Sequence, residues 1–294
     1  MRAVQGLILL LWVQLFVALV PTWLHGEYYS YGWFVPALAA GLAWRRWGLL
    51  GPRPDHETPA ARVGPLGAGL TLLAVAALVP LRFIGSADPG WRPPLLMHVL
   101  IVCGLTHGLL WKACGKRFSL GMLPVTLFAL SCVPYPWQLE RELIRALTGK
   151  VVSVTRECFL LAGRPVEMRG ECLVFDHAVV DVTDGCSGIR SLQSLLMVAL
   201  FFGEWFLLSW PRRIVMLLVA ALGAVVFNIL RAWWLASIDF NRGPAAAAAA
   251  HDALGYLCFG LAAALLWLTA FALLRKVSHP HHVLRRSQVN ALRT

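Results

Sequence analysis

Residues 182–210 read VTDGCSGIRSLQSLLMVALFFGEWFLLSW, a short polar segment followed at once by a long apolar run. The run 189–210 is long enough to cross the roughly 30 Å hydrocarbon core of a bilayer as an α-helix. Cys186 lies just before this helix, where the positive end of the helix dipole and access to water both favour a thiolate. The stretch alone fits a structural cysteine beside a helix cap equally well.

The composition of the whole chain indicates a membrane protein. Of its 294 residues, 59% are hydrophobic and only 14% are charged, and the mean hydropathy is +0.67. In soluble domains, roughly a quarter of all residues are charged. We therefore predict an all-α polytopic membrane protein with about eight transmembrane helices. The predicted spans are residues 7–24, 28–44, 64–84, 94–111, 118–137, 189–210, 214–238 and 251–274.

The positions of the basic residues predict the orientation. With eight spans both termini share one side, and the segments on that side hold 15 of the 26 Lys and Arg residues. Loops rich in Lys and Arg remain in the cytoplasm. We therefore expect both termini, including the basic tail 275–294, to be cytoplasmic in a bacterial inner membrane. The net charge of +11 then needs no nucleic-acid partner.

The long segment between the fifth and sixth spans, 138–185, is predicted to form a small extracytoplasmic cap. Residues 138–150 have apolar positions at helical spacing, as in helices that lie on a membrane surface. Residues 165–168, 172–175 and 178–182 have β character and are separated by turn signals. We interpret the chain as a single integral-membrane domain, residues 1–294. Its N-terminal helices are residues 1–127, and a catalytic core at 128–260 includes the cap.

Three residues far apart in sequence are predicted to meet at the outer face. Cys186 precedes the sixth span, Arg231 is near the outer end of the seventh, and His251 begins the eighth. A cysteine, a histidine and an arginine supply the nucleophile, proton shuttle and oxyanion-stabilising cation of an acyl-transfer site. Taken singly, each has a plain alternative: Arg231 could extend to the interface beside two tryptophans, and His251 could simply start a helix.

Further polar residues are candidates for supporting roles. Asn228 is one turn before Arg231 and is expected to orient it. Arg190 is one turn after Cys186 and could tune the thiolate or pair with Asp184. Asp184 itself fits a helix cap better than a catalytic acid.

Other features allow both functional and structural interpretations. Glu204 lies within the sixth span, where a carboxylate marks either a functional site or an ion pair. His98, near the outer end of the fourth span, is either a second histidine of the site or a packed polar residue. Cys158 and Cys172 share the predicted cap, where a disulfide could form. The seven cysteines form no CxxC pair, so no metal site or cofactor is implied.

Several short motifs together resemble the exosortase/archaeosortase family. They run in family order from about residue 128 to 259, while the N-terminal spans match only as generic hydrophobic helices. The motifs are Pro134-Tyr135-Pro136, Gly163-Arg164-Pro165-Val166, Cys186-Ser187-Gly188-Ile189-Arg190, Asn228-xx-Arg231 and His251-xxx-Gly255.

This resemblance implies a membrane cysteine transpeptidase. Its expected substrates are secreted proteins with a C-terminal sorting signal of the PEP-CTERM type: a short motif, a hydrophobic helix and a basic tail. The resemblance assigns the catalytic roles to Cys186, Arg231 and His251, and implies release of an acyl-thioester to an unknown acceptor.

Two alternatives of other classes are also consistent with parts of the sequence. A small polytopic transporter or scaffold would use Arg231 and Glu204 to line a path. A membrane acyltransferase would use His251 as base without a cysteine nucleophile. The polar residues cluster at the outer face, which favours the transpeptidase.

Overall fold

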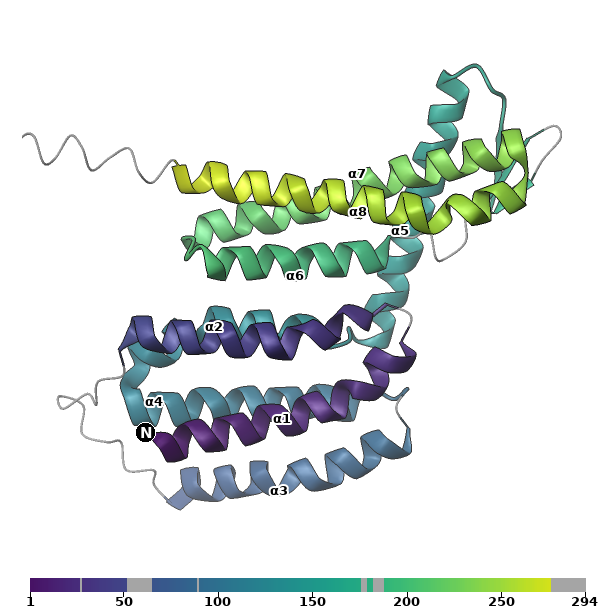
Figure 1. The fold of residues 1–294 in the computed structure, drawn as a ribbon. Helices are drawn as coiled ribbons and strands as arrows, with labels where there is room; N and C mark the ends of the chain where they lie inside the picture. The colour runs from purple at the N-terminus through teal and green to yellow at the C-terminus, as the bar shows by residue number, and fades with distance from the viewer. Residues whose placement is uncertain (27, 52–64, 89, 176–178, 182–187, 276–294) are drawn as a thin grey trace, which may run out of the picture. The chain divides into compact units, whose positions relative to one another are not determined.

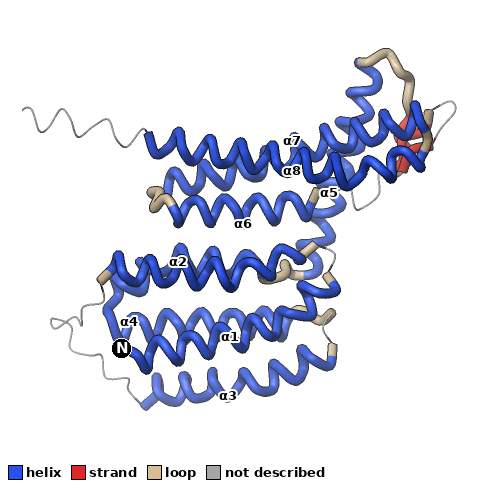
Figure 2. Tube along the Cα trace, viewed as in Figure 1, coloured by secondary structure: helices blue, strands red, loops and turns tan. Residues whose placement is uncertain are grey.

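The computed structural model describes residues 1–26, 28–51, 65–88, 90–175, 179–181 and 188–275 (Figure 1). The chain divides into two compact units, Met1–Arg141 and Glu142–Thr294. Each unit is a layered arrangement of helices, and the only strands among the described residues lie in the second unit (Figure 2).

The first unit packs its helices around α4. It contains α1 (Arg2–His25), η1 (Ser30–Phe34), α2 (Val35–Leu50), α3 (Pro65–Ala87), α4 (Pro93–Ala129), η2 (Leu130–Cys132) and the start of α5 (Trp137–Leu161). Helices α1, α2 and α3 all contact α4. Polar side chains reinforce this packing inside the unit: the Trp12 indole donates to Thr106 Oγ1 at 3.1 Å, and Trp23 donates to the Cys132 carbonyl at 3.2 Å.

Helix α4 folds back on itself at Gly115, which has φ 85° and ψ 166°. His107 Nδ1 lies 3.1 Å from Ser119 Oγ, and His107 Nε2 lies 3.0 Å from Thr126 Oγ1. In one straight helix His107 and Thr126 would lie about 28 Å apart. The element is therefore two antiparallel limbs, as expected for the predicted spans 94–111 and 118–137. The positive φ at the fold is a conformation that glycine adopts without penalty.

A buried ionic network joins the start of α4 to the start of α5. Arg92 makes two hydrogen bonds to the Glu140 carboxylate, at 2.8 and 2.9 Å, and the Tyr29 hydroxyl donates to the same carboxylate. The Tyr135 N–H in turn donates to the Tyr29 oxygen at 2.9 Å. Burial, followed by the bond to Glu140, raises the pKa of Tyr29, so its hydroxyl stays protonated as a donor. The Pro134-Tyr135-Pro136 motif thus contributes its backbone to this network.

In the second unit, the end of α5 and a three-stranded sheet form the structure that we predicted as a cap. The antiparallel strands are β1 (Glu167–Arg169), β2 (Cys172–Val174) and β3 (Val179–Asp181), in the order β1-β2-β3. The predicted β segments are confirmed at each of these positions. The predicted helical segment 138–150 is part of a longer continuous helix, α5, which extends to Leu161. Cys158 is a free thiol, so the disulfide with Cys172 is not formed.

Three further helices complete the second unit: α6 (Ile189–Trp205), α7 (Trp210–Arg242) and α8 (Pro244–Arg275). They lie side by side, and α7 and α8 extend beyond α6 to the sheet (Figures 1 and 2). The apolar cluster beside the sheet includes Phe159, Leu173 and Phe175 together with Ala232 and Ala236 of α7. The sheet and the end of α5 are therefore packed on α7, and their role as an extracytoplasmic cap stays a prediction.

Among the residues that the structure describes, five helices are long and apolar enough to cross a membrane: Arg2–His25, Gly67–Ala87, Pro93–Cys132, Trp210–Arg242 and Pro244–Leu274. One of these is the folded α4. Two further predicted spans correspond to α2 and α6, of 16 and 17 residues. Many large apolar side chains point outward, including Leu10, Leu72 and Phe83, each more than 60% exposed. Such a surface fits a multi-pass membrane protein. The number of eight spans and the single-domain boundaries stay predictions.

Candidate active site

Arg231 and His251 are in direct contact. Arg231 Nη2, on α7, lies 2.7 Å from His251 Nε2, on α8. An arginine side chain stays protonated and is only a donor, so His251 Nε2 is the acceptor. The imidazole is then neutral with its proton on Nδ1, which donates to Asp252 Oδ1 at 3.1 Å. Two of the three predicted catalytic residues therefore form a hydrogen-bonded pair. Both contacts of the imidazole fit the same tautomer of His251, with the proton on Nδ1.

The lengths of α7 and α8 place this pair beyond the apolar part of the helices. Arg231 lies about 32 Å along α7 from Trp210, and His251 about 36 Å along α8 from Arg275. Both values are close to the roughly 30 Å thickness of a hydrocarbon core. The two residues thus lie at the same end of the α7–α8 pair; their depth in a membrane stays a prediction.

Gly255 lies beside the guanidinium. It is one turn after His251, and a Cβ added to it would be 3.6 Å from Arg231 Nε, an ordinary van der Waals contact. Arg231 Nε itself is buried and has no hydrogen-bond partner among the described residues. A buried cationic donor without a partner is costly, so Arg231 retains capacity to bind a further acceptor.

The start of α6 is packed against α7 one turn before Arg231. Gly188 is the N-cap residue of α6, with φ 77° and ψ 6°, and no side chain caps the helix. A Cβ on Gly188 would lie 2.6 Å from Cγ of Asn228, which is only 4% exposed. We predicted that Asn228 orients Arg231; the structure places its amide against the backbone of Gly188. Asn228 therefore helps position the segment that follows the cysteine.

Of the predicted residues around the start of α6, the structure describes Arg190 but not Cys186 or Asp184. Cys186 and Asp184 lie outside the described residues. Arg190 is exposed in the first turn of α6. The N-cap position belongs to Gly188, which sequence analysis had not singled out.

Replacing Gly188 with alanine is expected to destabilise the fold and reduce activity. The new Cβ would overlap the buried Asn228 amide, an overpacking that costs about 1–3 kcal/mol. Alanine would also pay about 1–2 kcal/mol for a left-handed backbone. Denaturation of the purified chain in detergent measures the change in unfolding free energy.

Gly163→Ala is the matched control, because Gly163 has φ 74° but a Cβ there would have no neighbour within 4 Å. Both variants share the backbone penalty, so only Gly188→Ala adds the overlap with Asn228. Equal destabilisation by the two variants would show that the Gly188–Asn228 contact contributes nothing.

Glu204 belongs to a separate ion pair at the other end of α6. Its carboxylate accepts from Arg213 Nη2 at 2.8 Å, and Arg213 Nε donates to the Leu208 carbonyl. Arg213 and Arg231 are about 27 Å apart along α7. Glu204 therefore pairs with Arg213 at one end of α7, whereas Arg231 contacts His251 near the other end. This arrangement fits the interpretation of Glu204 as an ion-pair residue and does not favour a shared transport path.

Two other predicted features are also placed by the structure. His98 belongs to the first unit, where it lines a cavity with α1 and α3. Arg164, in the Gly163-Arg164-Pro165-Val166 motif, stacks its guanidinium over Phe240 of α7 at 5.0 Å. This motif fixes the cap onto the helix that carries Arg231. Sequence analysis overlooked Asp252, which directly follows His251. Its only signal in the sequence is that it is a carboxylate next to a candidate base.

Comparison with known proteins identifies the family. No curated protein and no solved structure matches the chain. The sequence profile of the family described as transmembrane exosortase matches residues 23–268, a range that includes Asn228, Arg231 and His251 as well as Cys186. The match extends well beyond the 128–259 segment whose motifs carry the resemblance. The chain therefore belongs to the transmembrane exosortase family.

Proposed function

We propose that this exosortase is a cysteine transpeptidase that cleaves C-terminal sorting signals of secreted proteins at the outer face of the bacterial inner membrane. The observation that carries the proposal is the hydrogen-bonded pair of Arg231 and His251 at the common end of α7 and α8. A proton acceptor and a cation with an unused buried donor are the two groups that acyl transfer needs beside a nucleophile.

The sequence position of Cys186 supports it as that nucleophile. It is two residues before Gly188, the N-cap residue of α6, whose backbone lies close to Asn228 of α7, one turn from Arg231. A cysteine just before a helix N-terminus also favours the thiolate form, which is the reactive form.

The proposed reaction begins with proton transfer from the Cys186 thiol to His251 Nε2. The thiolate sulfur attacks the backbone carbonyl carbon of the sorting motif and forms a C–S bond, and Arg231 donates hydrogen bonds to the oxyanion. The C–N bond then breaks, and His251 returns the proton to the leaving amine. The amine departs with the hydrophobic helix and basic tail, and an acyl-thioester remains on Cys186.

The hydrogen bond between Arg231 and His251 must be broken before this reaction can start. Arg231 Nη2 occupies the Nε2 lone pair that would accept the thiol proton. When a substrate oxygen takes over the arginine donors, that lone pair becomes available. Substrate binding would thereby switch His251 from acceptor of an arginine bond to proton shuttle, while Asp252 keeps the proton on Nδ1 in place. The thioester is finally transferred to an amine or another nucleophile, or hydrolysed.

The experiment that tests the proposal is capture of the thioester. The full chain is purified with a co-expressed substrate that carries a motif, an apolar helix and an Arg/Lys tail, and is analysed by intact-mass spectrometry. We expect an adduct on Cys186 that neutral hydroxylamine removes, because hydroxylamine cleaves thioesters. An adduct on another residue, or one that resists hydroxylamine, would contradict the mechanism. Processing by a Cys186→Ala variant would instead favour an acyltransferase with His251 as base.

A further inference from the structure

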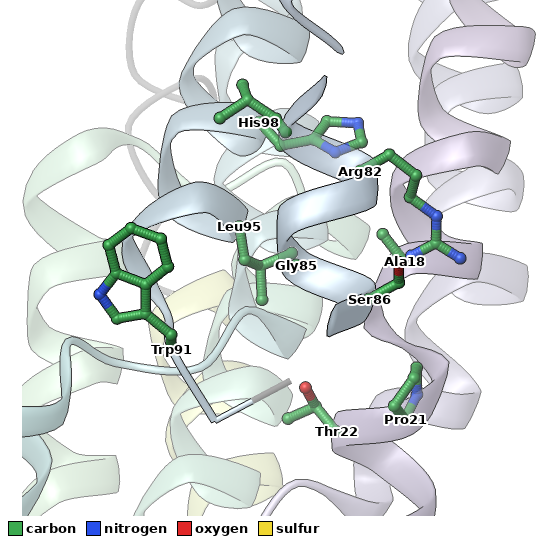
Figure 3. A pocket seen from close by; sticks show the side chains of 10 residues that line it. Ala18, Pro21, Thr22, Arg82, Gly85, Ser86, Trp91, Leu95 and His98 are labelled. Carbon is green, nitrogen blue, oxygen red and sulfur yellow. The ribbon is translucent and has the colours of Figure 1, made fainter. Parts of the chain in front are cut away.

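The first unit contains a cavity of about 130 Å³ between the end of α1, the end of α3 and the start of α4 (Figure 3). Its wall combines apolar and polar side chains. Those that matter here are Thr22, Arg82, Ser86, Trp91, Leu95 and His98. The polar groups come from three different helices, so the cavity is assembled by the fold and not by one local segment.

The Nε2 atom of His98 is buried and lacks a hydrogen-bond partner among the described residues. The side chain is 2% exposed, and Nε2 makes no hydrogen bond to any described residue. Figure 3 shows the imidazole extending from α4 toward Arg82 of α3. An unpaired polar atom in a membrane protein costs several kcal/mol, because lipid supplies no substitute for water. A ligand or water in the cavity would provide the partner.

The charge of the cavity favours an anion. Arg82 and Ser86 are one turn apart on the same face of α3, and Thr22 of α1 adds a second hydroxyl. The Ser86 hydroxyl donates to the Phe83 carbonyl at 2.8 Å, so it would have to rotate to donate to a ligand. None of the described lining residues is acidic. Arginine binds phosphate through two parallel hydrogen bonds, and rotatable hydroxyls complete such a site.

The location selects the kind of anion. All the lining residues lie in the last turns of α1 and α3 or near the start of α4, the level at which a helix leaves the hydrocarbon. Trp91 is about half exposed there, and interfacial tryptophans mark the headgroup region. Leu81 and Leu95 provide an apolar wall for the part of a ligand that enters the membrane. Basic pockets between membrane helices are suited to lipid head groups.

We propose that this cavity binds the phosphate group of an anionic phospholipid, held by Arg82, Ser86 and the unpartnered nitrogen of His98. The acyl chains would run along the exposed apolar surface of α3, which includes Leu72, Leu73 and Phe83. The site belongs to the first unit alone and does not depend on the reaction proposed for the second.

Lipid binding to the full-length chain in detergent tests the proposal. Dioleoylphosphatidylglycerol is titrated into the purified protein, and bound lipid is counted by native mass spectrometry while thermal unfolding is followed in parallel. Losing a charge-assisted contact costs about a factor of ten or more in affinity, so Arg82→Gln should weaken binding at least tenfold. Ser86→Ala, at an exposed position that should fold normally, should weaken it several-fold.

Arg2→Gln is the matched control, because it removes one exposed cation at the opposite end of α1 and should leave the affinity unchanged. Equal affinities for wild type and Arg82→Gln would refute the site. Equal protection by inorganic phosphate would identify a site for free anions and not for lipid. Equal binding of phosphatidylcholine would show that the negative charge is not recognised, which also overturns the proposal.

Discussion

Replacing Cys186 with alanine is expected to reduce processing of a sorting-signal substrate by about 10⁴-fold or more. In the proposed mechanism Cys186 forms the only covalent bond to the substrate, so its loss removes the acyl-enzyme route entirely. Arg231 and His251 would remain paired, because their contact does not involve the cysteine. Cys186→Ser should recover little activity, since a serine hydroxyl is not ionised beside a neutral imidazole to the extent that a thiol is.

The measurement is the fraction of co-expressed substrate that loses its C-terminal tail in cells, compared between variants with equal amounts of enzyme. Cys103→Ala is the matched control, because Cys103 is a half-buried thiol of α4 in the first unit and should be replaceable without loss. Normal processing by Cys186→Ala would exclude the transpeptidase mechanism, whatever the family of the chain.

The position of Arg231 and His251 at one end of the α7–α8 pair was predictable from the sequence because it follows from the lengths of two apolar runs. Arg231 stands at the end of one run and His251 at the start of the next. The direct contact between them was not predictable. It depends on the register of α7 against α8, which is set by side-chain packing across the two helices.

The continuation of α7 and α8 beyond their apolar runs was only partly predictable from the sequence. The segment after residue 238 is polar or alanine-rich, so hydropathy assigns it to a loop or leaves it open. Gly243 has φ 83° and α8 begins at Pro244, the order in which helices commonly end and begin. Alanine is the strongest helix former, so the six-alanine run extends α8 and is not a slack linker.

The continuity of α5 shows how tertiary contacts override a local pattern. Residues 151–162 are too polar to span a membrane, and sequence analysis placed them in the cap without assigning an element. Val151, Val152 and Phe159 are nevertheless buried against the sheet and α7. Their partners in the sheet and α7 are 14 residues (Phe159 to Leu173) to 85 residues (Val151 to Ala236) away in sequence, which is why local periodicity did not reveal them.

Substituting lysine for Arg231 is expected to lower kcat by about 10²–10³-fold, the usual loss when one oxyanion donor is removed. Lysine keeps the charge but is a flexible point donor, whereas the guanidinium presents several donors in a fixed plane. Once a substrate oxygen has displaced His251 from Arg231, the guanidinium can present Nη2 and the previously unused Nε to the oxyanion together. Lysine cannot present two donors in one fixed plane, so KM should change less than kcat because the main loss is in the transition state.

Arg242→Lys is the matched control, because Arg242 is an exposed arginine in the last turn of the same helix and should tolerate the change. A purely structural role for Arg231 predicts a different result: kcat and KM should stay near wild type in whatever fraction of Arg231→Lys remains folded. Thioester capture separates the two cases, since loss of oxyanion stabilisation slows formation of the Cys186 adduct in folded enzyme. Unchanged adduct formation in folded Arg231→Lys would remove Arg231 from the reaction and leave it as a helix-packing residue.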